Sequence, residues 1–288
     1  MNPDTRTYSF ELFPPKTPAG MEKLQANVTR MNQVNPRYFS VTYGAGGSTQ
    51  ERSFDTVDWL RTQGIDTAPH LSCVGSSKSE IRVILQRYRD QGIHRIVALR
   101  GDLPSGMGLG AAGELSYANE LVEFIRDETG DHFHIEVAAY PEFHPQARSA
   151  QADLANFKRK ADAGADAAIT QYFYSAQAYY AFVDSCRRLG VEIPIVPGIM
   201  PITNYGSLAR FSDACGAEIP RWIRKRLEGY GDDLDSIRAF GHEVVLDLCQ
   251  QLLDHGAPGL HFYTMNQAEP SLRLWQELKL PGSDRITD

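Results

Sequence analysis

The chain has 288 residues, of which 42% are hydrophobic and 23% are charged, so it can bury a sizeable core. Its formal net charge of -7 provides no broad basic surface for nucleic acid, and no segment is long and apolar enough for a membrane span. Four cysteines are scattered without a C-x-x-C pair, and the first residues lack the order of a signal peptide. These features favour a protein of the reducing cytoplasm.

Short β-branched or apolar segments alternate along the chain with longer amphipathic segments. The segments predicted to be strands are 7–13, 37–43, 66–72, 94–100, 134–140, 167–173, 193–199 and 259–265. The segments predicted to be helices are 20–34, 50–63, 78–91, 114–128, 150–163, 176–189 and 204–214, with another helix after the last strand.

The predicted strands begin at intervals of about 30 residues, which is typical of βα units joined by right-handed crossovers. Eight such units close into a barrel, so we predict an α/β fold with a single (β/α)8 TIM-barrel domain over residues 1–288. The interval between the seventh and eighth strands is longer and contains a strong helical pattern at 234–255. We therefore predict an insertion there.

A barrel of this kind carries its ligand site where the strands end. The predicted strand ends supply acidic, basic, amide and hydroxyl side chains, namely Glu11, Thr42, His70, Arg100, Asp102, Tyr140, Gln171 and Tyr263. A barrel with only a structural role would not require polar groups from so many strands on one rim. The sequence therefore predicts a functional rim.

Several segments, in this order and near the expected spacing, resemble the methylenetetrahydrofolate reductase family. They are FELFPPKT, FSVTYGAGG, APHLSC, IVALRGDLP, VAAYPEFHP, QADLANFKRKADAGADAAITQYFY, IPIVPGIMPI and HFYTMN. The resemblance covers nearly the whole chain. It implies an eight-stranded barrel that binds FAD, takes electrons from NADH or NADPH and reduces methylenetetrahydrofolate. For this family a homo-oligomer is also expected.

Glu11 lies between Phe10 and Leu12 in the first predicted strand, where a carboxylate is costly unless it has a role. The resemblance assigns it the role of general acid, because opening the folate methylene bridge to a 5-iminium cation requires a proton on N10. A free glutamate is mostly ionised at neutral pH, whereas apolar surroundings favour the protonated form. The alternative is a structural glutamate paired with Lys16.

The resemblance places Asp102 beside the flavin and the pterin, where an ionised carboxylate would stabilise the iminium cation. The alternative for Asp102 is an Asx turn that shapes the loop. Gln171 corresponds to a folate-contacting glutamine, since an amide offers both a donor and an acceptor to the pterin edge. Its alternative is an amide that satisfies the barrel backbone.

Asp153, Asn156 and Lys160 share one face of the helix predicted over 150–163, and Arg159 lies beside that face. By itself this pattern is typical of the solvated face of an outer helix. The resemblance instead assigns these four residues to FAD. It also assigns contacts with the flavin or the nicotinamide to Thr42, His70, Arg100, Gly101, Asp102, Tyr140 and His144.

Two positions depart from the family pattern. Some bacterial relatives carry an aromatic residue over the active site where this chain has Leu227, and an arginine is expected where it has Gln267. We predict folate contacts for Leu227 and Tyr263, and the sequence does not distinguish NADH from NADPH. Two other functions remain open. One is a flavin-free barrel that transfers a methyl group from methyltetrahydrofolate, and the other is a flavin-holding subunit reduced by a partner protein.

The segment GLGAAG, residues 108–113, matches the glycine pattern of dinucleotide-binding proteins. It does not directly follow a predicted strand, because DLPSGM intervenes, so we predict a rim loop instead. The histidines of DHFHIE lack a third ligand at zinc spacing, and no metal site is predicted.

Overall fold

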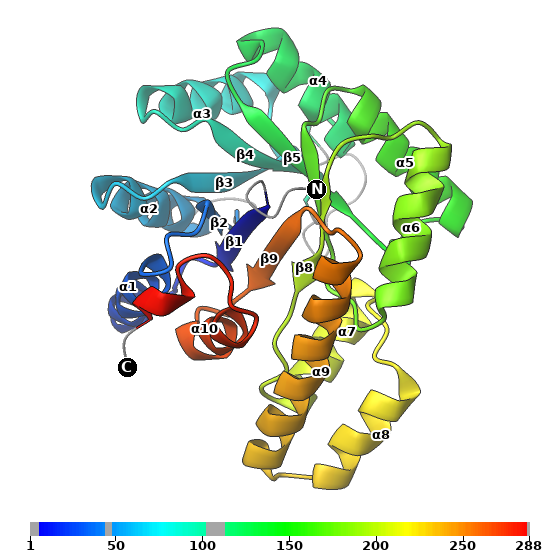
Figure 1. Cartoon of the computed structure of the whole chain (residues 1–288). Helices are drawn as coiled ribbons and strands as arrows, with labels where there is room; N and C mark the ends of the chain where they lie inside the picture. The colour runs from blue at the N-terminus through cyan, green and yellow to red at the C-terminus, as the bar shows by residue number, and fades with distance from the viewer. Residues whose placement is uncertain (1–5, 44–47, 102–112, 287–288) are drawn as a thin grey trace.

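The strands of the computed structural model, which describes residues 6–43, 48–101 and 113–286, form one parallel sheet. They are β1 Thr7–Leu12, β2 Tyr38–Val41, β3 Thr67–Ser72, β4 Arg95–Leu99, β5 His134–Ala139, β6 Ala167–Thr170, β7 Ile195–Val196, β8 Gly198–Ile199 and β9 Gly259–Tyr263. Their order in the sheet is β7-β6-β5-β4-β3-β2-β1-β9-β8. The strands are surrounded by helices, as a barrel requires (Figure 1).

The helices alternate with the strands along the chain. They are α1 Pro18–Asn32, α2 Ser48–Thr62, α3 Lys78–Asp90, α4 Ala118–Thr129, α5 Ala150–Asp162, α6 Ala176–Arg188, α7 Tyr205–Cys215, α8 Arg221–Tyr230, α9 Leu234–Asp254 and α10 Ala268–Glu277, followed by the 3-10 helix η3 Ser283–Arg285. Polar side chains cap several of them at their first turn. Ser77 and Glu80, for example, form a reciprocal capping box at the start of α3.

The seventh predicted strand, 193–199, is divided into β7 and β8 on either side of Pro197. Proline lacks the backbone N–H that a continuous ladder needs, so the strand is interrupted at this residue. The first piece, β7, pairs with β6, and the second piece, β8, pairs with β9. The two pieces of one segment therefore close the ring, and the predicted (β/α)8 barrel is confirmed.

The predicted insertion between the last two strands is also confirmed. Helices α8 and α9 lie side by side and extend away from the barrel (Figure 1).

Helix α4 begins at Ala118, four residues later than predicted. The Glu120 side chain accepts a hydrogen bond from the Ser116 backbone N–H just before this helix. Within the described residues, no helix is long and apolar enough to cross a membrane.

Alternate side chains of β1 point to the outer face of the barrel and to its interior. Phe10 points outward and packs against Phe39, Phe262 and Trp275, with ring centroids 5.6, 5.7 and 5.1 Å away. This aromatic cluster holds the strands against helix α10. Because side chains alternate along a strand, the neighbouring Ser9 and Glu11 point into the barrel. The same pattern that fixes the core thus delivers a carboxylate to the barrel interior.

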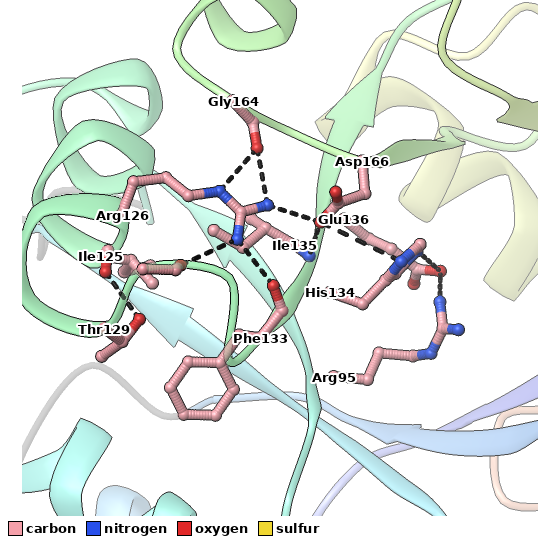
Figure 2. Close-up of polar contacts among 11 residues, drawn as sticks. Arg95, Ile125, Arg126, Thr129, Phe133, His134, Ile135, Glu136, Gly164 and Asp166 are labelled. Atoms are coloured by element: carbon pink, nitrogen blue, oxygen red, sulfur yellow. Dashed lines mark hydrogen bonds and ion pairs between the residues drawn. The ribbon is translucent and has the colours of Figure 1, made fainter.

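The ends of the barrel have different roles. Opposite the rim, the Arg126 guanidinium of α4 donates to the carbonyl oxygens of Gly164 and Phe133 at 2.8 Å and to Asp166 at 2.6 Å (Figure 2). These bonds tie α4 to the loops that lead into β5 and β6. Such contacts stabilise the fold and leave the carboxyl ends of the strands for ligands.

Candidate functional site

Glu11 occupies the mouth of the barrel near the end of β1. Its side chain is 20% exposed, and Oε2 lies 3.5 Å from His70 Nε2 and 3.8 Å from His261 Nε2. These histidines come from β3 and β9, on either side of Glu11 in the ring. Within the described residues Glu11 contacts these two histidines and forms no ion pair with Lys16. The alternative of a glutamate paired with Lys16 is therefore not supported.

His70 is buried, and its Nε2 atom has no hydrogen-bond partner within the described residues. Burial lowers the pKa of His70, and His261 reinforces this change while the carboxylates of Glu11 and Glu136 oppose it. The imidazole is therefore neutral at pH 7. A neutral ring with an unused nitrogen at the barrel mouth can bind a polar ligand atom, which agrees with the predicted cofactor contact.

His261 was not predicted from the sequence. Its ring is fully buried, with Nδ1 2.7 Å from Ser9 Oγ and Nε2 3.5 Å from Ser40 Oγ. The position of His261, two residues before Tyr263 in a predicted strand, indicated that both side chains point to the same face. That periodicity was the available signal. It could not show that the ring meets Glu11, because this contact depends on the pairing of β1 with β9.

Several predicted cofactor residues meet on the other side of the rim, after β4 and β5. The rings of Tyr140 and His144 lie edge to face with centroids 4.6 Å apart, and the His144 backbone N–H donates to Asp153 Oδ2 at 2.9 Å. Arg100 donates to Gln146 Oε1 at 2.5 Å, and the Gln146 backbone N–H donates to His144 Nδ1 at 3.0 Å. These bonds order the loop between β5 and α5.

Helix α5 carries the predicted polar face. Lys160 is half-buried and donates to the Ala138 carbonyl oxygen at 2.5 Å, while Asn156 and Arg159 are exposed and bonded to each other at 2.6 Å. Burial lowers the pKa of Lys160 to about 8, against the opposing charge of Asp153. Lys160 forms no ion pair within the described residues. A partly desolvated cation of this kind favours an anionic ligand.

Gln171 and Tyr263 both lie on the rim, and their side chains form different hydrogen bonds. The Gln171 side chain accepts from the Tyr172 backbone N–H at 2.9 Å and lines a small pocket with Tyr140, Glu142 and Cys215. The Tyr263 hydroxyl donates to the Thr170 carbonyl oxygen at 2.6 Å. The hydroxyl proton of Tyr263 is therefore used within the barrel, and the predicted contact of Tyr263 with folate stays a prediction.

Glu142 and Cys215, which share that pocket, were not singled out by the sequence. Burial raises the pKa of Glu142, although its carboxylate accepts from the Glu218 backbone N–H at 2.7 Å. This bond ties the β5 loop to the chain that follows α7. The pocket is therefore built by the residues that follow β5 and β6 together with the end of α7 and the residues just after it.

Three further predicted residues have local roles in the structure. The Thr42 carbonyl oxygen accepts from the Ser53 hydroxyl at 3.0 Å, which links the end of β2 to α2. Gly101 has a φ of +84°, and a Cβ atom added there would lie 1.9 Å from Ser72 Oγ. Leu227 is fully buried on α8. Its predicted contact with folate stays a prediction.

Asp102 and the glycine segment that begins at residue 108 lie outside the described residues, apart from Gly113. The electrostatic role of Asp102 therefore remains the expectation that the sequence resemblance gave. The described part of the rim nevertheless brings together Glu11 and His70 on one side and Arg100, Tyr140 and His144 on the other.

The fold and the rim define an α/β-barrel protein with a ligand site at the carboxyl ends of its strands. Residues 1–279 match the family model described as methylenetetrahydrofolate reductase. The chain is 40% identical over 276 residues to the 5,10-methylenetetrahydrofolate reductase of Escherichia coli (strain K12), covering 95% of the chain and 91% of that protein. It therefore belongs to the methylenetetrahydrofolate reductase family.

Two further comparisons concern a plant relative and the fold. Methylenetetrahydrofolate reductase (NADH) 1 of Arabidopsis thaliana is 36% identical over 292 residues, covering 97% of the chain and 49% of that protein. A solved Clostridium thermocellum protein that binds two copies of 5-methyl-5,6,7,8-tetrahydrofolic acid superimposes with a TM-score of 0.69 at 17% identity. The superposition covers 96% of this chain and 95% of that protein, and it supports the fold.

Proposed function

We propose that this chain reduces 5,10-methylenetetrahydrofolate to 5-methyltetrahydrofolate, with FAD as bound cofactor and NADH or NADPH as electron donor. Membership of the family supports the reaction. The structural observation that carries it is the position of Glu11, an inward-facing carboxyl group at the barrel mouth between His70 and His261. A proton donor at that place is what opening of the folate bridge requires.

The residues present fit a flavin dinucleotide. Lys160 is a half-buried cation without an ion-pair partner in the described part of the chain, and the exposed guanidinium of Arg159 lies on the same helix. Both suit a diphosphate. His70 supplies a buried nitrogen that lacks a hydrogen-bond partner. Bound there, FAD would accept hydride from the nicotinamide and donate hydride to the folate.

The chain's own residues would act mainly on the folate. Glu11 would deliver its proton to N10, so that the bond between N10 and the methylene carbon breaks and the 5-iminium cation forms. Gln171 would orient the pterin through its amide. By family resemblance, Asp102 would stabilise the cation through its negative charge.

Anaerobic mixing of the purified protein with NADH and with NADPH tests this proposal. We expect a yellow protein whose flavin absorbance is bleached by at least one nicotinamide and restored by methylenetetrahydrofolate. A colourless protein that does not bind added FAD would favour the methyl-transferring barrel. A yellow protein that neither nicotinamide bleaches would favour the subunit reduced by a partner.

We also propose that the protein works as a homo-oligomer in the cytoplasm. All four cysteines are unpaired in the structure, which agrees with a reducing compartment. Light scattering after size-exclusion chromatography tests the oligomeric state, and a monomer at micromolar concentration would contradict it.

A further inference from the structure

The turn between β9 and α10 has a strained backbone. Met265 and Asn266 both adopt the left-handed conformation, with φ of +51° and +56°. This conformation is uncommon for residues other than glycine, and it tends to occur at functional sites. Because the chain leaves the extended conformation here, the backbone pairing of β9 with β1 ends at Tyr263 and Glu11.

Beyond that pair, two side chains of the turn bond to the end of β1. Thr264 Oγ1 donates to the Glu11 carbonyl oxygen at 2.7 Å and accepts from the Asn266 backbone N–H at 3.0 Å. Asn266 Oδ1 accepts from the Phe13 backbone N–H at 3.0 Å, and Asn266 Nδ2 donates to the Phe13 carbonyl oxygen at 2.8 Å. The Asn266 amide therefore pairs with Phe13 as a peptide group of a neighbouring strand would.

The other side of β1 is held by the backbone of β2. The Leu12 carbonyl oxygen accepts from the Thr42 backbone N–H at 2.9 Å. Three consecutive residues of β1 and its end, Glu11 to Phe13, are thus fixed from both sides. Pro14 and Pro15 follow directly, and neither has a backbone N–H to donate.

The direction of the Glu11 side chain depends on this backbone. Its carboxyl group lies 3.5 Å from His70 Nε2 and 3.8 Å from His261 Nε2, and both distances are longer than a normal hydrogen bond. These contacts alone hold the carboxyl group weakly. The position of the Glu11 main chain therefore decides where the carboxyl group lies at the barrel mouth.

We propose that Thr264 and Asn266 are positioning residues for Glu11, because they clamp the end of β1 and so aim the carboxyl group at the folate. The inference rests on the proposed role of Glu11 as proton donor. A reacting group that is misplaced by about 1 Å can lose about 10²-fold in rate. The hydrogen bonds that the left-handed turn permits would thus act on proton transfer to the folate.

Four variants separate the parts of this clamp. Asn266→Gly tolerates the left-handed backbone but removes both bonds to Phe13. Asn266→Asp keeps the acceptor for the Phe13 N–H and loses the donor to its carbonyl oxygen. Thr264→Val removes the hydroxyl group, whereas Thr264→Ser keeps it. Asn35→Gly is the matched control, since Asn35 is an exposed asparagine with φ of +52° at the other end of the barrel, between α1 and β2.

Amide hydrogen exchange tests the clamp without any need for activity. Because Pro14 and Pro15 carry no amide hydrogen, a peptide that ends there reports Phe13 as its last exchanging residue. We expect the Phe13 amide to exchange at least about tenfold faster in Asn266→Gly than in the wild type. Asn266→Asp and Asn35→Gly should keep the slow exchange. Unchanged exchange in Asn266→Gly would overturn the inference.

Stopped-flow kinetics tests the effect on Glu11. In Asn266→Gly and Thr264→Val, the limiting rate at which the folate reoxidises the reduced flavin should fall about tenfold. The half-saturating folate concentration and the rate of flavin reduction by the nicotinamide should stay within about threefold. Thr264→Ser and Asn35→Gly should behave as the wild type. Equal losses in both half-reactions would show that the turn only stabilises the fold, and would contradict the inference.

The double variant Glu11→Gln/Asn266→Gly decides whether Asn266 acts through Glu11. On the Glu11→Gln background, loss of the clamp should slow the folate step by less than about twofold, because no proton donor is left to misplace. A further tenfold loss would show that Asn266 acts independently of Glu11 and would overturn the inference. A wild-type protein that never reduces the folate would refute the proposed function, whereas unchanged exchange in Asn266→Gly refutes the clamp alone.

Discussion

Glu11 Oε2 lies 3.5 Å from His70 Nε2, although the two residues belong to β1 and β3 and are separated in the ring by β2. The contact joins the residue predicted to protonate the folate to one predicted to bind the cofactor. Both side chains point into the barrel, so they can meet across its mouth. Burial lowers the pKa of His70, so this contact is not a permanent ion pair.

Lys160→Met is expected to weaken FAD binding by about tenfold or more, because a charge-assisted hydrogen bond contributes about 1.5–3 kcal/mol. Titration of the apoprotein with FAD, followed by flavin fluorescence, measures the effect. Lys158→Met is the control, since Lys158 lies on the same helix and pairs with Asp162 at 2.7 Å. Equal affinities for all three proteins would remove Lys160 from the cofactor site.

The lowered pKa of Lys160 implies that the stability of the protein depends on pH. Burial lowers the pKa of Lys160 to about 8 in the folded apoprotein, whereas an unfolded lysine titrates near about 10.4. Between these values the unfolded chain binds more protons, so the contribution of Lys160 to the free energy of unfolding rises with pH. Urea unfolding from pH 7 to 10.5 should show a steeper rise in the wild type than in Lys160→Met. Parallel curves would contradict the pKa shift.

Gly101→Ala should destabilise the protein by about 1–3 kcal/mol and weaken FAD binding, because the added Cβ would lie 1.9 Å from Ser72 Oγ. Gly64→Ala separates this clash from backbone strain, since Gly64 also has a positive φ of +70° but no atom within 4 Å of the added Cβ. Urea unfolding and FAD titration compare the two variants. If both lose the same stability and neither loses FAD affinity, the close approach at Gly101 has no role at the site.

Arg126→Ala should lower the free energy of unfolding by about 2–4 kcal/mol, because it removes an ion pair to Asp166 and leaves several carbonyl oxygens without their donor. The Arg126 side chain is only 19% exposed. Arg82→Ala is the control, since Arg82 makes an exposed pair with Glu128 and should cost less. FAD affinity should not change in either variant, and a large loss in Arg126→Ala would show that the two ends of the barrel are coupled.

The barrel could be predicted from the sequence because each strand and helix leaves a local pattern of hydrophobic residues. Alternation within strands and the spacing of βα units identified each strand, but the break at Pro197 in 193–199 was not predicted. The sequence could not show that the two halves of this segment pair with different neighbours. That result depends on closure of the whole ring.

The candidate site was predicted less completely. Glu11, Tyr140 and the face of α5 were singled out through the family motifs, whereas His261 was missed. Alternation places the His261 side chain on the inner face of β9, but its contact with Glu11 depends on strand register and barrel diameter. Leu227 lies four residues after Ile223 on α8, and both side chains are buried, which was not predicted.

Glu11→Gln tests the proposed protonation of the folate by Glu11, because glutamine keeps the shape of glutamate without an acidic proton. The variant should bind FAD and be reduced by the nicotinamide at nearly the wild-type rate. Its reduced flavin should be reoxidised by methylenetetrahydrofolate about 10² to 10⁴ times more slowly, since only this step requires the proton. Glu269→Gln, at an exposed position on α10, should behave as the wild type in both steps.

Anaerobic stopped-flow absorbance of the flavin, recorded separately for the two half-reactions, is the most direct measurement. We expect a loss confined to reoxidation by the folate. Reoxidation of reduced Glu11→Gln at a rate near that of the wild type would contradict it.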